Sequence, residues 1–312
     1  GEETYCGIEA PAGDGWEQDP DTLDTWFSSG LWTFSTLGWG SDEAKWEREK
    51  IYHPTALLET GYDILFFWVA RMILMSEYFL KEPPFKTVYL HGLVRAADGR
   101  KMSKSLDNFV DPLDVIASHG ADALRLALVY GSTPGNDLKL SDEKILTMRN
   151  FVNKLWNMSR YVLMAEGDAS PELSLADRWI LCRLAAVTQA VTEHMEKYQI
   201  SLATETLREF TVSDFADWYI EINKREKNIP VLRSVMEALL KLWHPFLPFV
   251  TEAIWSHLEK PQLLLATDWP IAESSEEESL IADFETLRTF VTQVRNLRAL
   301  YRIAPKALLT VI

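Results

Sequence analysis

The feature that most constrains the fold is a strand–helix–strand pattern in the first hundred residues. Thr55–Leu58 is a short apolar run, and Thr87–Leu90 is rich in β-branched and aromatic residues, so both segments predict strands. Between them, Ile64–Leu80 is apolar almost all round and predicts a buried helix, which Pro83-Pro84 ends. Two strands joined through a helix form a βαβ unit. The pattern therefore predicts a parallel sheet and an α/β fold.

The second part of the chain has a different pattern, in which helical periodicity replaces the strand signals. Asp111-Pro112 predicts the start of a short helix, Ser141 is a typical helix N-cap, and Ser174 and Asp177 have the spacing of a capping box. The longer helices are predicted at residues 141–164, 174–197, 201–224, 231–243 and 250–258. Together they predict an all-α helical bundle.

The order of these patterns predicts an α/β region followed by the bundle. The bundle is followed by a solvated linker at residues 274–279, an amphipathic helix at 280–301 and a strand at 308–312. We therefore expect four parts, which span residues 1–95, 96–140, 141–270 and 271–312.

Composition excludes several classes of protein. The net charge of −15 over 312 residues disfavours non-specific nucleic-acid binding by the whole surface, but it allows a local basic face. The longest apolar run, residues 64–75, contains Arg71 and is shorter than the ~20 residues of a membrane span. Cys6 and Cys182 predict neither a disulfide framework nor a zinc site. Because Gly1 opens no signal-peptide pattern, we expect a cytoplasmic segment of a longer protein.

The segment that carries chemistry is Lys101-Met102-Ser103-Lys104-Ser105. Its two lysines present compact cations with rotatable donors, and its serines add hydroxyl groups. Asp98-Gly99 predicts a turn just before them, so the lysines lie on a loop that can close over a triphosphate. There they can stabilise the charge that develops as pyrophosphate leaves. An arbitrary lysine pair at this spacing would be a solvated turn, but the whole pentapeptide after a strand favours a catalytic loop.

This pentapeptide resembles the KMSKS loop of class I aminoacyl-tRNA synthetases, and its flanks resemble one family of that class, the valyl-tRNA synthetases. Isoleucyl and leucyl relatives share the loop, but they are not expected to carry both Asp24–Ser29 and Ser35–Trp39. The matching segments cover nearly the whole chain. They are Asp21–Ser29, Ser35–Trp39, Thr60–Met72, His91–Arg95, Arg149–Asn157, Ser174–Ile180 and His244–Glu252.

Two departures accompany the resemblance. No HIGH-type motif occurs in the sequence, although the family carries one in the first half of its nucleotide-binding fold, before an editing insertion. The resemblance therefore implies the second half of a Rossmann-like nucleotide-binding domain and a helical anticodon-binding domain, inactive on their own. Asp107 stands where the family usually has glycine, and this change would stiffen the exit of the loop.

The resemblance implies roles for individual residues. Gly61, Asp63, His91 and Gly92 match positions where the family binds the adenylate. The loop Lys101–Ser105 would bind ATP, with Lys101 and Lys104 as its catalytic residues. From the residues alone, Asp63 is also suited to cap a helix, and His91 is also suited to a place in a core.

Three apolar residues resemble those that line the valine side-chain pocket of the family: Trp26, Ile64 and Trp68. The spacing of Ile64 and Trp68 places them on one face of a helix. An apolar pocket wall and an ordinary core look alike in sequence, so a core role stays open for all three.

The helical part resembles the anticodon-binding domain, whose partner is tRNA. Basic residues along its helices suit contact with RNA phosphates, and a solvated face is the alternative for each of them. They are Lys144, Arg149, Lys154, Arg160, Lys224, Arg225, Lys227, Arg288, Arg295, Arg298 and Arg302.

The implied function is ATP-dependent activation of L-valine and its transfer to tRNA. Mg²⁺ enters with the ATP, and we expect no metal bound by the protein itself, no membrane partner and a monomer. Two alternatives remain. In the first, the enzyme activates isoleucine in place of valine. In the second, the chain is a tRNA-binding module without catalysis.

Overall fold

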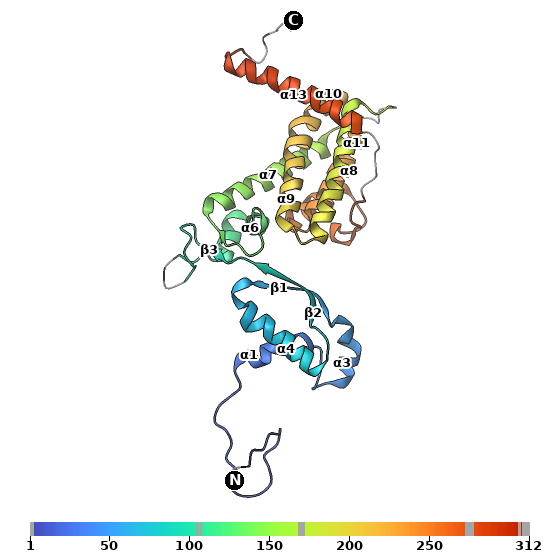
Figure 1. Ribbon diagram of the computed structural model, residues 1–312. Helices are drawn as coiled ribbons and strands as arrows, with labels where there is room; N and C mark the ends of the chain where they lie inside the picture. The colour runs from blue at the N-terminus through green and yellow to red at the C-terminus, as the bar shows by residue number, and fades with distance from the viewer. Residues whose placement is uncertain are drawn as a thin grey trace. The chain divides into compact units, whose positions relative to one another are not determined.

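A computed structural model of the chain describes residues 3–103, 106, 108–167, 172–271, 278–304 and 307, with the backbone alone at 278–280. The chain forms two compact units, residues 1–91 and residues 92–312, and each is described by itself (Figure 1). None of the helices in the described ranges is long and apolar enough to cross a membrane.

The first unit is built on two parallel strands. β1 (Thr55–Gly61) pairs with β2 (Phe85–His91), with Thr55 opposite Phe85 and Gly61 opposite His91, so the predicted parallel pair is confirmed. The other elements of this unit are α1 (Thr25–Gly30), α2 (Trp32–Ser35), α3 (Glu43–Glu49), the 3₁₀ turns η1 (Lys50–Tyr52) and η2 (Tyr62–Ile64), the π-helix η3 (Leu65–Val69) and α4 (Ala70–Phe79).

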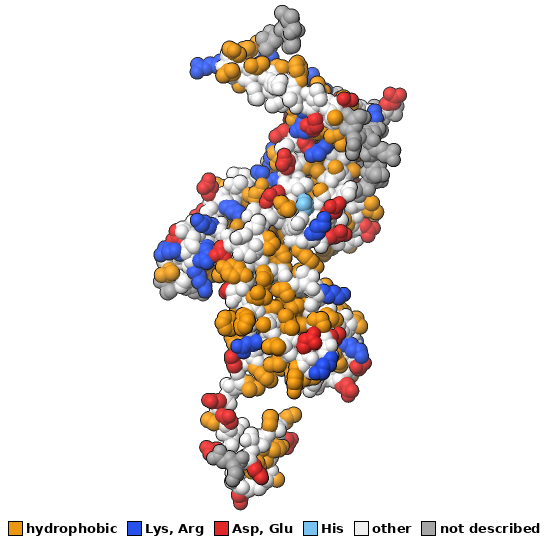
Figure 2. Space-filling model, in the orientation of Figure 1, with side chains coloured by type: hydrophobic (Ala, Val, Ile, Leu, Met, Phe, Trp, Pro, Cys, Tyr) orange, Lys and Arg blue, Asp and Glu red, His pale blue; other side chains and the backbone are white. Residues whose placement is uncertain are grey.

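The segment between the strands differs from the single buried helix that the sequence predicts. It begins as η2, continues as η3 and becomes α-helical only in α4. Val69 and Met72 pack with Phe85 in a small core, whereas Phe66 and Leu74 are 81% and 68% exposed. Burial all round is therefore wrong for the described structure, because the two strands cover only one side of the helix. Figure 2 shows apolar side chains gathered over this unit.

The second unit begins with a second parallel pair, β3 (Val94–Arg95) with β4 (Leu138–Lys139). Two helices lie between these strands in the chain, α5 (Pro112–His119) and α6 (Ala121–Val129). The predicted start of α5 is confirmed, because the Asp111 carboxylate accepts a hydrogen bond from the backbone N–H of Leu113 and Pro112 occupies the first turn.

The rest of the second unit is a helical bundle, and no strand follows β4 among the described residues. The hydroxyl of Ser141 caps the first long helix, and Ser174 with Asp177 forms the predicted capping box of the next. The elements are α7 (Asp142–Met164), α8 (Leu175–Glu196), α9 (Ile200–Glu209), the π-helix η5 (Phe210–Tyr219), α10 (Ile220–Glu226), α11 (Ile229–Trp243), α12 (Pro248–Trp255), the 3₁₀ turns η6 (Ser256–Leu258) and η7 (Leu264–Ala266), and α13 (Glu278–Leu300).

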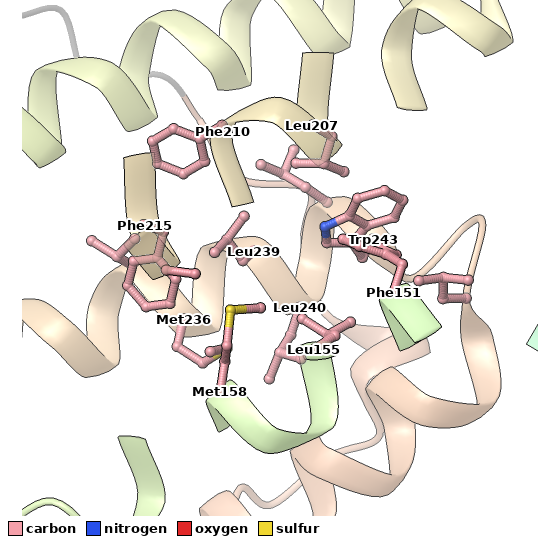
Figure 3. Close-up of a cluster of buried hydrophobic side chains, with 14 of the residues drawn as sticks. Phe151, Leu155, Met158, Leu207, Phe210, Phe215, Met236, Leu239, Leu240 and Trp243 are labelled. Carbon is pink, nitrogen blue, oxygen red and sulfur yellow. The ribbon is translucent and has the colours of Figure 1, made fainter. Parts of the chain in front are cut away.

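The bundle has one extensive apolar core. Side chains from α7, α9, η5 and α11 meet in its centre (Figure 3). Trp243 is fully buried there, its ring centroid lies 4.9 Å from that of Phe151, and its indole N–H donates to the hydroxyl of Thr211 at 2.9 Å. The predicted strand at 308–312 and most of the predicted linker at 274–279 lie outside the described residues.

A π-helix interrupts the helix that the sequence predicts at 201–224. In η5 the residues Phe210, Asp214, Phe215 and Tyr219 are all buried. Their spacing of four to five residues suits the wider turn of a π-helix, which closes hydrogen bonds between residues five apart. Leu202, on the α-helical part before the π-helix, is exposed, so the predicted single apolar face does not extend to it.

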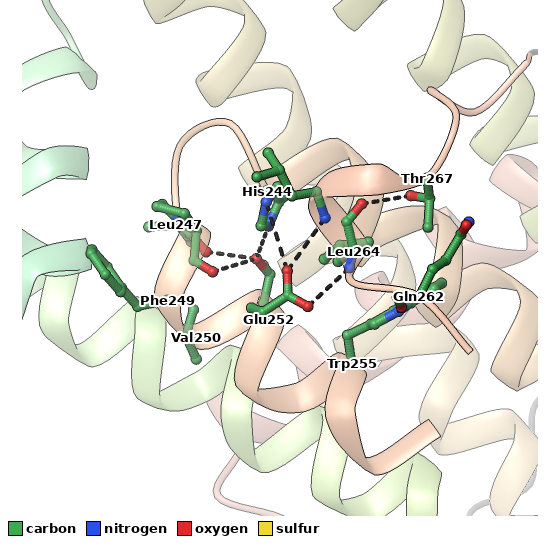
Figure 4. Close-up of polar contacts among 12 residues, drawn as sticks. His244, Leu247, Phe249, Val250, Glu252, Trp255, Gln262, Leu264 and Thr267 are labelled. Carbon is green, nitrogen blue, oxygen red and sulfur yellow. Dashed lines mark hydrogen bonds and ion pairs between the residues drawn. The ribbon is translucent and has the colours of Figure 1, made fainter. Parts of the chain in front are cut away.

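The segment His244–Glu252 forms the corner between α11 and α12 (Figure 4). The carboxylate of Glu252 accepts from the backbone N–H groups of Leu264 and Leu265, and Nδ1 of His244 lies 2.8 Å from the hydroxyl of Thr251. From the other side, Asp122 on α6 accepts from the first N–H groups of α12. Burial raises the pKa of Asp122, against these hydrogen bonds. The corner therefore joins α6 to the bundle.

Candidate functional site

The carboxyl ends of β1 and β2 bring two of the predicted residues together. Gly61 and His91 are register partners at the last position of their strands, where α/β sheets bind ligands. The side chain of His91 is 43% exposed, and its Nε2 lies 3.2 Å from Oε1 of Glu59, so a core role does not describe it. Burial of the phenol, and to a lesser extent the negative charge of Glu59, raises the pKa of Tyr89. The phenol therefore stays neutral, and Glu59 supplies a carboxylate beside His91 at this edge.

Asp63 lies just beyond the end of β1, in η2. The N-cap positions of η2 and η3 are Gly61 and Ile64, and neither helix has a side-chain cap. The structure thus does not use Asp63 as the helix cap that its sequence position also allowed. Its side chain is exposed and forms no hydrogen bond or ion pair within the described ranges. A carboxylate in this state can accept from the hydroxyl groups of a ligand.

The three apolar candidates lie on α1, η2 and η3 of the first unit. The indole N–H of Trp68 donates to the carbonyl of Ser29 at 3.1 Å and so ties η3 to α1. The ring of Trp26 lies 6.4 Å from that of Phe67. Ile64 and both tryptophans are half-buried, a state between the core and the surface. Two of the three candidates therefore come from elements that are joined by a direct hydrogen bond.

One side chain, that of Asn108, closes the base of the loop that begins at Lys101; we call these contacts the neck of the loop. The amide of Asn108 donates to the carbonyl of Lys101 at 3.2 Å and accepts from the N–H of Ser103 at 2.9 Å. Lys101 is exposed, and Met102 is half-buried against the bundle core. Lys104, Ser105 and Asp107 lie outside the described residues. Asn108 therefore holds both sides of the loop at its base.

A tight turn precedes this loop. Gly99 has a φ of +85°, a conformation that favours glycine, and its N–H donates to the carbonyl of Ala96 at 2.8 Å. The Asp98 carboxylate accepts from the backbone N–H and the side chain of Arg100, and these hydrogen bonds lower the pKa of Asp98. Arg95 on β3 is bridged to Lys101 in antiparallel fashion. The predicted turn at Asp98-Gly99 is present and returns the chain to β3.

Gly92 lies where two backbone segments approach closely. A Cβ atom at this position would lie 1.7 Å from the carbonyl oxygen of Asn136. Next to it, the N–H of Leu93 donates to the carboxylate of Asp137 at 2.8 Å, and Asp137 also pairs with Arg95. Gly92 therefore has a structural reason to be glycine, besides the role in adenylate binding that the sequence predicts.

A groove runs along the bundle between α7 and the η5–α10 segment. It consists of two adjoining hollows of about 320 and 540 Å³, which share Asn157, Tyr161 and Lys224. We call this feature the α7–α10 groove. Asn223, which is 1% exposed, lines one hollow, and its Oδ1 accepts no hydrogen bond in the described structure. Asn223 is held from within the bundle, because its amide nitrogen donates to the carbonyl of Asn228 at 3.0 Å.

Four basic side chains line the α7–α10 groove, together with the acidic Glu166, Asp217 and Glu221. Nζ of Lys224 lies 5.7 Å from the centre of the Tyr161 ring and 2.6 Å from Glu221, and Lys154 pairs with Asp217 at 3.2 Å. Arg160 and Lys227 line the groove and form no ion pair among the described residues. An aromatic ring beside unpaired cations suits a single-stranded nucleic acid, whose bases stack and whose phosphates are anionic.

The arginines of α13 differ from one another in their surroundings. Arg288 pairs with the buried carboxylate of Asp214 at 2.8 Å and lies 5.2 Å from the ring centre of Trp179. Arg298 donates to the carbonyl of Ala304 at 2.8 Å. Groups of the protein itself already bind both of these side chains. Their contact with RNA stays a prediction.

In the described ranges, no group of three or more His, Cys, Asp or Glu side chains could hold a metal ion.

Comparisons with known proteins agree with these features. Residues 8–141 match the family of class I tRNA synthetases for I, L, M and V, and residues 177–312 match the anticodon-binding domain of tRNA ligases. The valine–tRNA ligase of Carboxydothermus hydrogenoformans is 48% identical over 305 residues, which are 92% of this chain and 34% of that protein. The valine–tRNA ligase of Streptococcus thermophilus is 43% identical over 99% of this chain and 38% of its own length.

The chain belongs to the class I tRNA synthetases. It spans about a third of the length of the curated synthetases that it matches. Among solved structures, the LeuRS–tRNA–LeuAMS complex of Agrobacterium radiobacter K84 has a TM-score of 0.69 at 23% identity, over 85% of this chain and 34% of that one. The methionyl-adenylate complex of Mycobacterium tuberculosis methionyl-tRNA synthetase has a TM-score of 0.60 at 24% identity, over 76% and 50%. These two likenesses show that the synthetase fold is shared.

Three polar residues of this synthetase chain were missed by sequence reasoning. Glu59 pairs with His91, Asn108 closes the neck of the loop, and Asn223 lines the α7–α10 groove. A short apolar run followed by Glu-Thr-Gly does carry a signal for Glu59, because residues at the end of a parallel strand face the ligand edge. Asn108 and Asn223 depend on contacts that their neighbours in sequence do not reveal.

Proposed function

We propose that the full-length protein is a valine–tRNA ligase. It activates L-valine with Mg-ATP to valyl-adenylate and pyrophosphate, and then transfers the valyl group to a ribose hydroxyl of the terminal adenosine of tRNA. The observation that carries this proposal is the 43–48% identity to valine–tRNA ligases along nearly the whole chain. In this scheme the enzyme accelerates the reaction by positioning the substrates and by stabilising the charge of the transition state, and no covalent enzyme intermediate is needed.

The adenylate is proposed to bind at the strand edge of the first unit. Gly61 allows the ligand to approach the backbone, and the exposed carboxylate of Asp63 accepts from the ribose hydroxyls. His91, which Glu59 orients from 3.2 Å, donates to the adenylate from the neighbouring strand, and Gly92 continues that edge.

The phosphates are proposed to bind at Lys101–Ser105. Ser103 donates through its hydroxyl, and the cations of Lys101 and Lys104 neutralise the charge that develops on the leaving pyrophosphate. The hydrogen bonds of Asn108 support this role, because they fix Lys101 and Ser103 at the base of the loop. Mg²⁺ is carried in by the ATP as part of the substrate.

The side chain of valine is proposed to contact Trp26, Ile64 and Trp68. Their partial burial and the hydrogen bond from Trp68 to Ser29 support a rigid apolar wall at the surface of the first unit. Ile64→Ala in the full-length enzyme removes part of this wall and opens space for a larger side chain. The substitution should therefore improve the kcat/KM for isoleucine relative to that for valine. An unchanged ratio with both rates intact would place Ile64 behind the pocket.

The RNA partner is proposed to be tRNA, with unstacked bases in the α7–α10 groove. Tyr161 offers a stacking surface, and Arg160 and Lys227 offer phosphate contacts. The residues then divide into the second half of the catalytic domain (1–95), the loop and connecting helices (96–140), the anticodon-binding domain (141–270) and a C-terminal part (271–312). We further propose a cytoplasmic monomer.

The experiment that tests this function is pyrophosphate exchange by the full-length protein with valine and isoleucine in parallel. We expect exchange to depend on valine, with isoleucine far weaker. The 312-residue chain, which has no HIGH motif, should give none. Exchange that prefers isoleucine would reassign the amino acid. If the full-length protein binds tRNA but exchanges with no amino acid, it is a binding module instead.

A further inference from the structure

One charged side chain of α4, Arg71, contacts the helix that carries Trp26. The guanidinium carbon of Arg71 lies 5.9 Å from the centre of the Trp26 ring, and its Nη1 lies 3.8 Å from Oδ2 of Asp24. Asp24 is the N-cap of α1, and its other oxygen accepts from the backbone N–H of Trp26 at 3.2 Å. Arg71 therefore contacts both the first turn of α1 and the ring that projects from it.

The two tryptophans of the apolar wall are anchored in different ways. Trp68 has a hydrogen bond from its indole N–H to Ser29, which fixes its ring directly. The indole N–H of Trp26 has no hydrogen-bond partner within the described ranges, and its neighbour Phe67 is itself 54% exposed. The cation of Arg71 is thus the contact that orients the face of Trp26.

Close packing below this contact leaves the two helices little freedom. A Cβ atom at Gly30 would lie 3.3 Å from Cγ of Met75 and 3.5 Å from Cβ of Arg71, so the end of α1 sits against the backbone of α4. The beginning of α1 lacks such packing, because Thr25 and Phe27 are exposed. Arg71 therefore contacts α1 at its less closely packed first turn.

We propose that Arg71 is a positioning residue for amino-acid selection. By holding Trp26 toward η3 it sets the width of the apolar wall, and so the size of the aliphatic side chain that fits. This inference rests on the proposed function, in which Trp26 contacts the substrate. Arg71 and Asp24 are 40% and 63% exposed, and an ion pair this accessible to solvent adds little to stability. Loss of Arg71 should therefore change selection without unfolding the unit.

The test is Arg71→Met in the full-length enzyme, which keeps an aliphatic stem and removes the guanidinium. We expect the ratio of kcat/KM for valine to that for isoleucine in pyrophosphate exchange to fall about two- to fivefold, the scale of one exposed cation–π contact. The KM for ATP and the midpoint of thermal unfolding should stay as in the wild type. The matched control is Arg48→Met, because Arg48 pairs with Glu49 on α3 and is 68% exposed; it should change neither ratio nor KM.

A second measurement separates positioning from general damage. Asp24→Asn keeps a good N-cap but removes the ion pair, so it should shift the ratio in the same direction and by less. In a Trp26→Leu background, Arg71→Met should shift the ratio no further, because the ring that it orients is gone. Equal losses for both amino acids, or an unchanged ratio at wild-type activity, would overturn the inference. Absence of valine-dependent exchange by the wild type would instead overturn the proposed function.

Discussion

The first unit and the helical bundle bury their apolar side chains to different degrees. In the first unit the fully buried helix–sheet cluster is Val69, Met72 and Phe85, while Phe66, Leu74 and Tyr78 on the same helix segment are exposed. In the bundle one continuous core joins α7, α8, α9, η5 and α11 (Figure 3). The first unit offers polar groups at a sheet edge, and the bundle offers a groove on a closed body. We infer that the α/β elements carry the chemistry and that the bundle carries the stability and the RNA surface.

The largest expected effect is a loss of catalytic rate that leaves the fold of the bundle unchanged. Lys104→Ala in the full-length enzyme should slow adenylate formation by about a hundredfold to a thousandfold, the scale of one lost transition-state stabiliser. Binding of valine and tRNA should change little, because the lysine acts on phosphate charge that develops late. The measurement is single-turnover adenylate formation, with Lys86→Ala on β2 as the control. Normal turnover with weaker tRNA binding would make the loop an RNA contact.

The next effect is a loss of stability in the helical bundle, at a residue far in sequence from the proposed catalytic loop. Trp243→Ala removes a fully buried indole that also donates to Thr211, and should lower the free energy of unfolding by about 3–5 kcal/mol. Chemical denaturation followed by far-UV circular dichroism measures this loss. Trp156→Ala is the matched control, since Trp156 lies on α7 and is 40% exposed. Comparable losses for the two variants would contradict the view that the core around Trp243 holds the bundle together.

A third change tests whether the neck of the loop matters for chemistry. Asn108→Ala removes hydrogen bonds to Lys101 and Ser103, each worth about 1 kcal/mol, so adenylate formation should slow by up to about thirtyfold. The KM for valine should not change. Asn136→Ala is the control, because its amide bonds only within the turn at Thr133 and Pro134. A wild-type rate in Asn108→Ala would show that other contacts order the loop.

The smallest effect concerns the α7–α10 groove. Arg160→Gln removes a cation that has no ion-pair partner in the described structure, so tRNA affinity should fall a few-fold. The slope of log affinity against log salt should decrease by about one, and pyrophosphate exchange without tRNA should stay the same. Arg48→Gln in the first unit is the control. An unchanged salt slope would place the RNA elsewhere on the bundle.

Much of the fold followed from local patterns. The caps at Asp111, Ser141 and Ser174 were predicted and are present, because a cap is made by a side chain and backbone groups within three residues of it. The parallel pairing of β1 and β2 was also predicted, since a strand–helix–strand sequence has few other solutions. The π-helices η3 and η5 were not predicted, because a 3.6-residue period was assumed throughout.

The candidate site was predictable only in part. The strand ends at Gly61 and His91 were anticipated, whereas Glu59 and Asn108 were found only through their contacts with His91, Lys101 and Ser103. The roles assigned to Lys101, Asp63 and Trp26 stay predictions until the enzyme is assayed.

The sequence by itself determined where the capped helices α5, α7 and α8 begin, that β1 and β2 pair in parallel and which loop carries the cations, because these depend on neighbouring residues and on their periodicity. Only the tertiary structure decided which side of the η3–α4 segment is covered, where the helices widen into π-turns, and that Arg71 reaches Trp26 across two helices. Burial and cross-helix contacts arise between residues far apart in the chain. No local pattern encodes the distance between such residues, so the packing of the whole unit sets it.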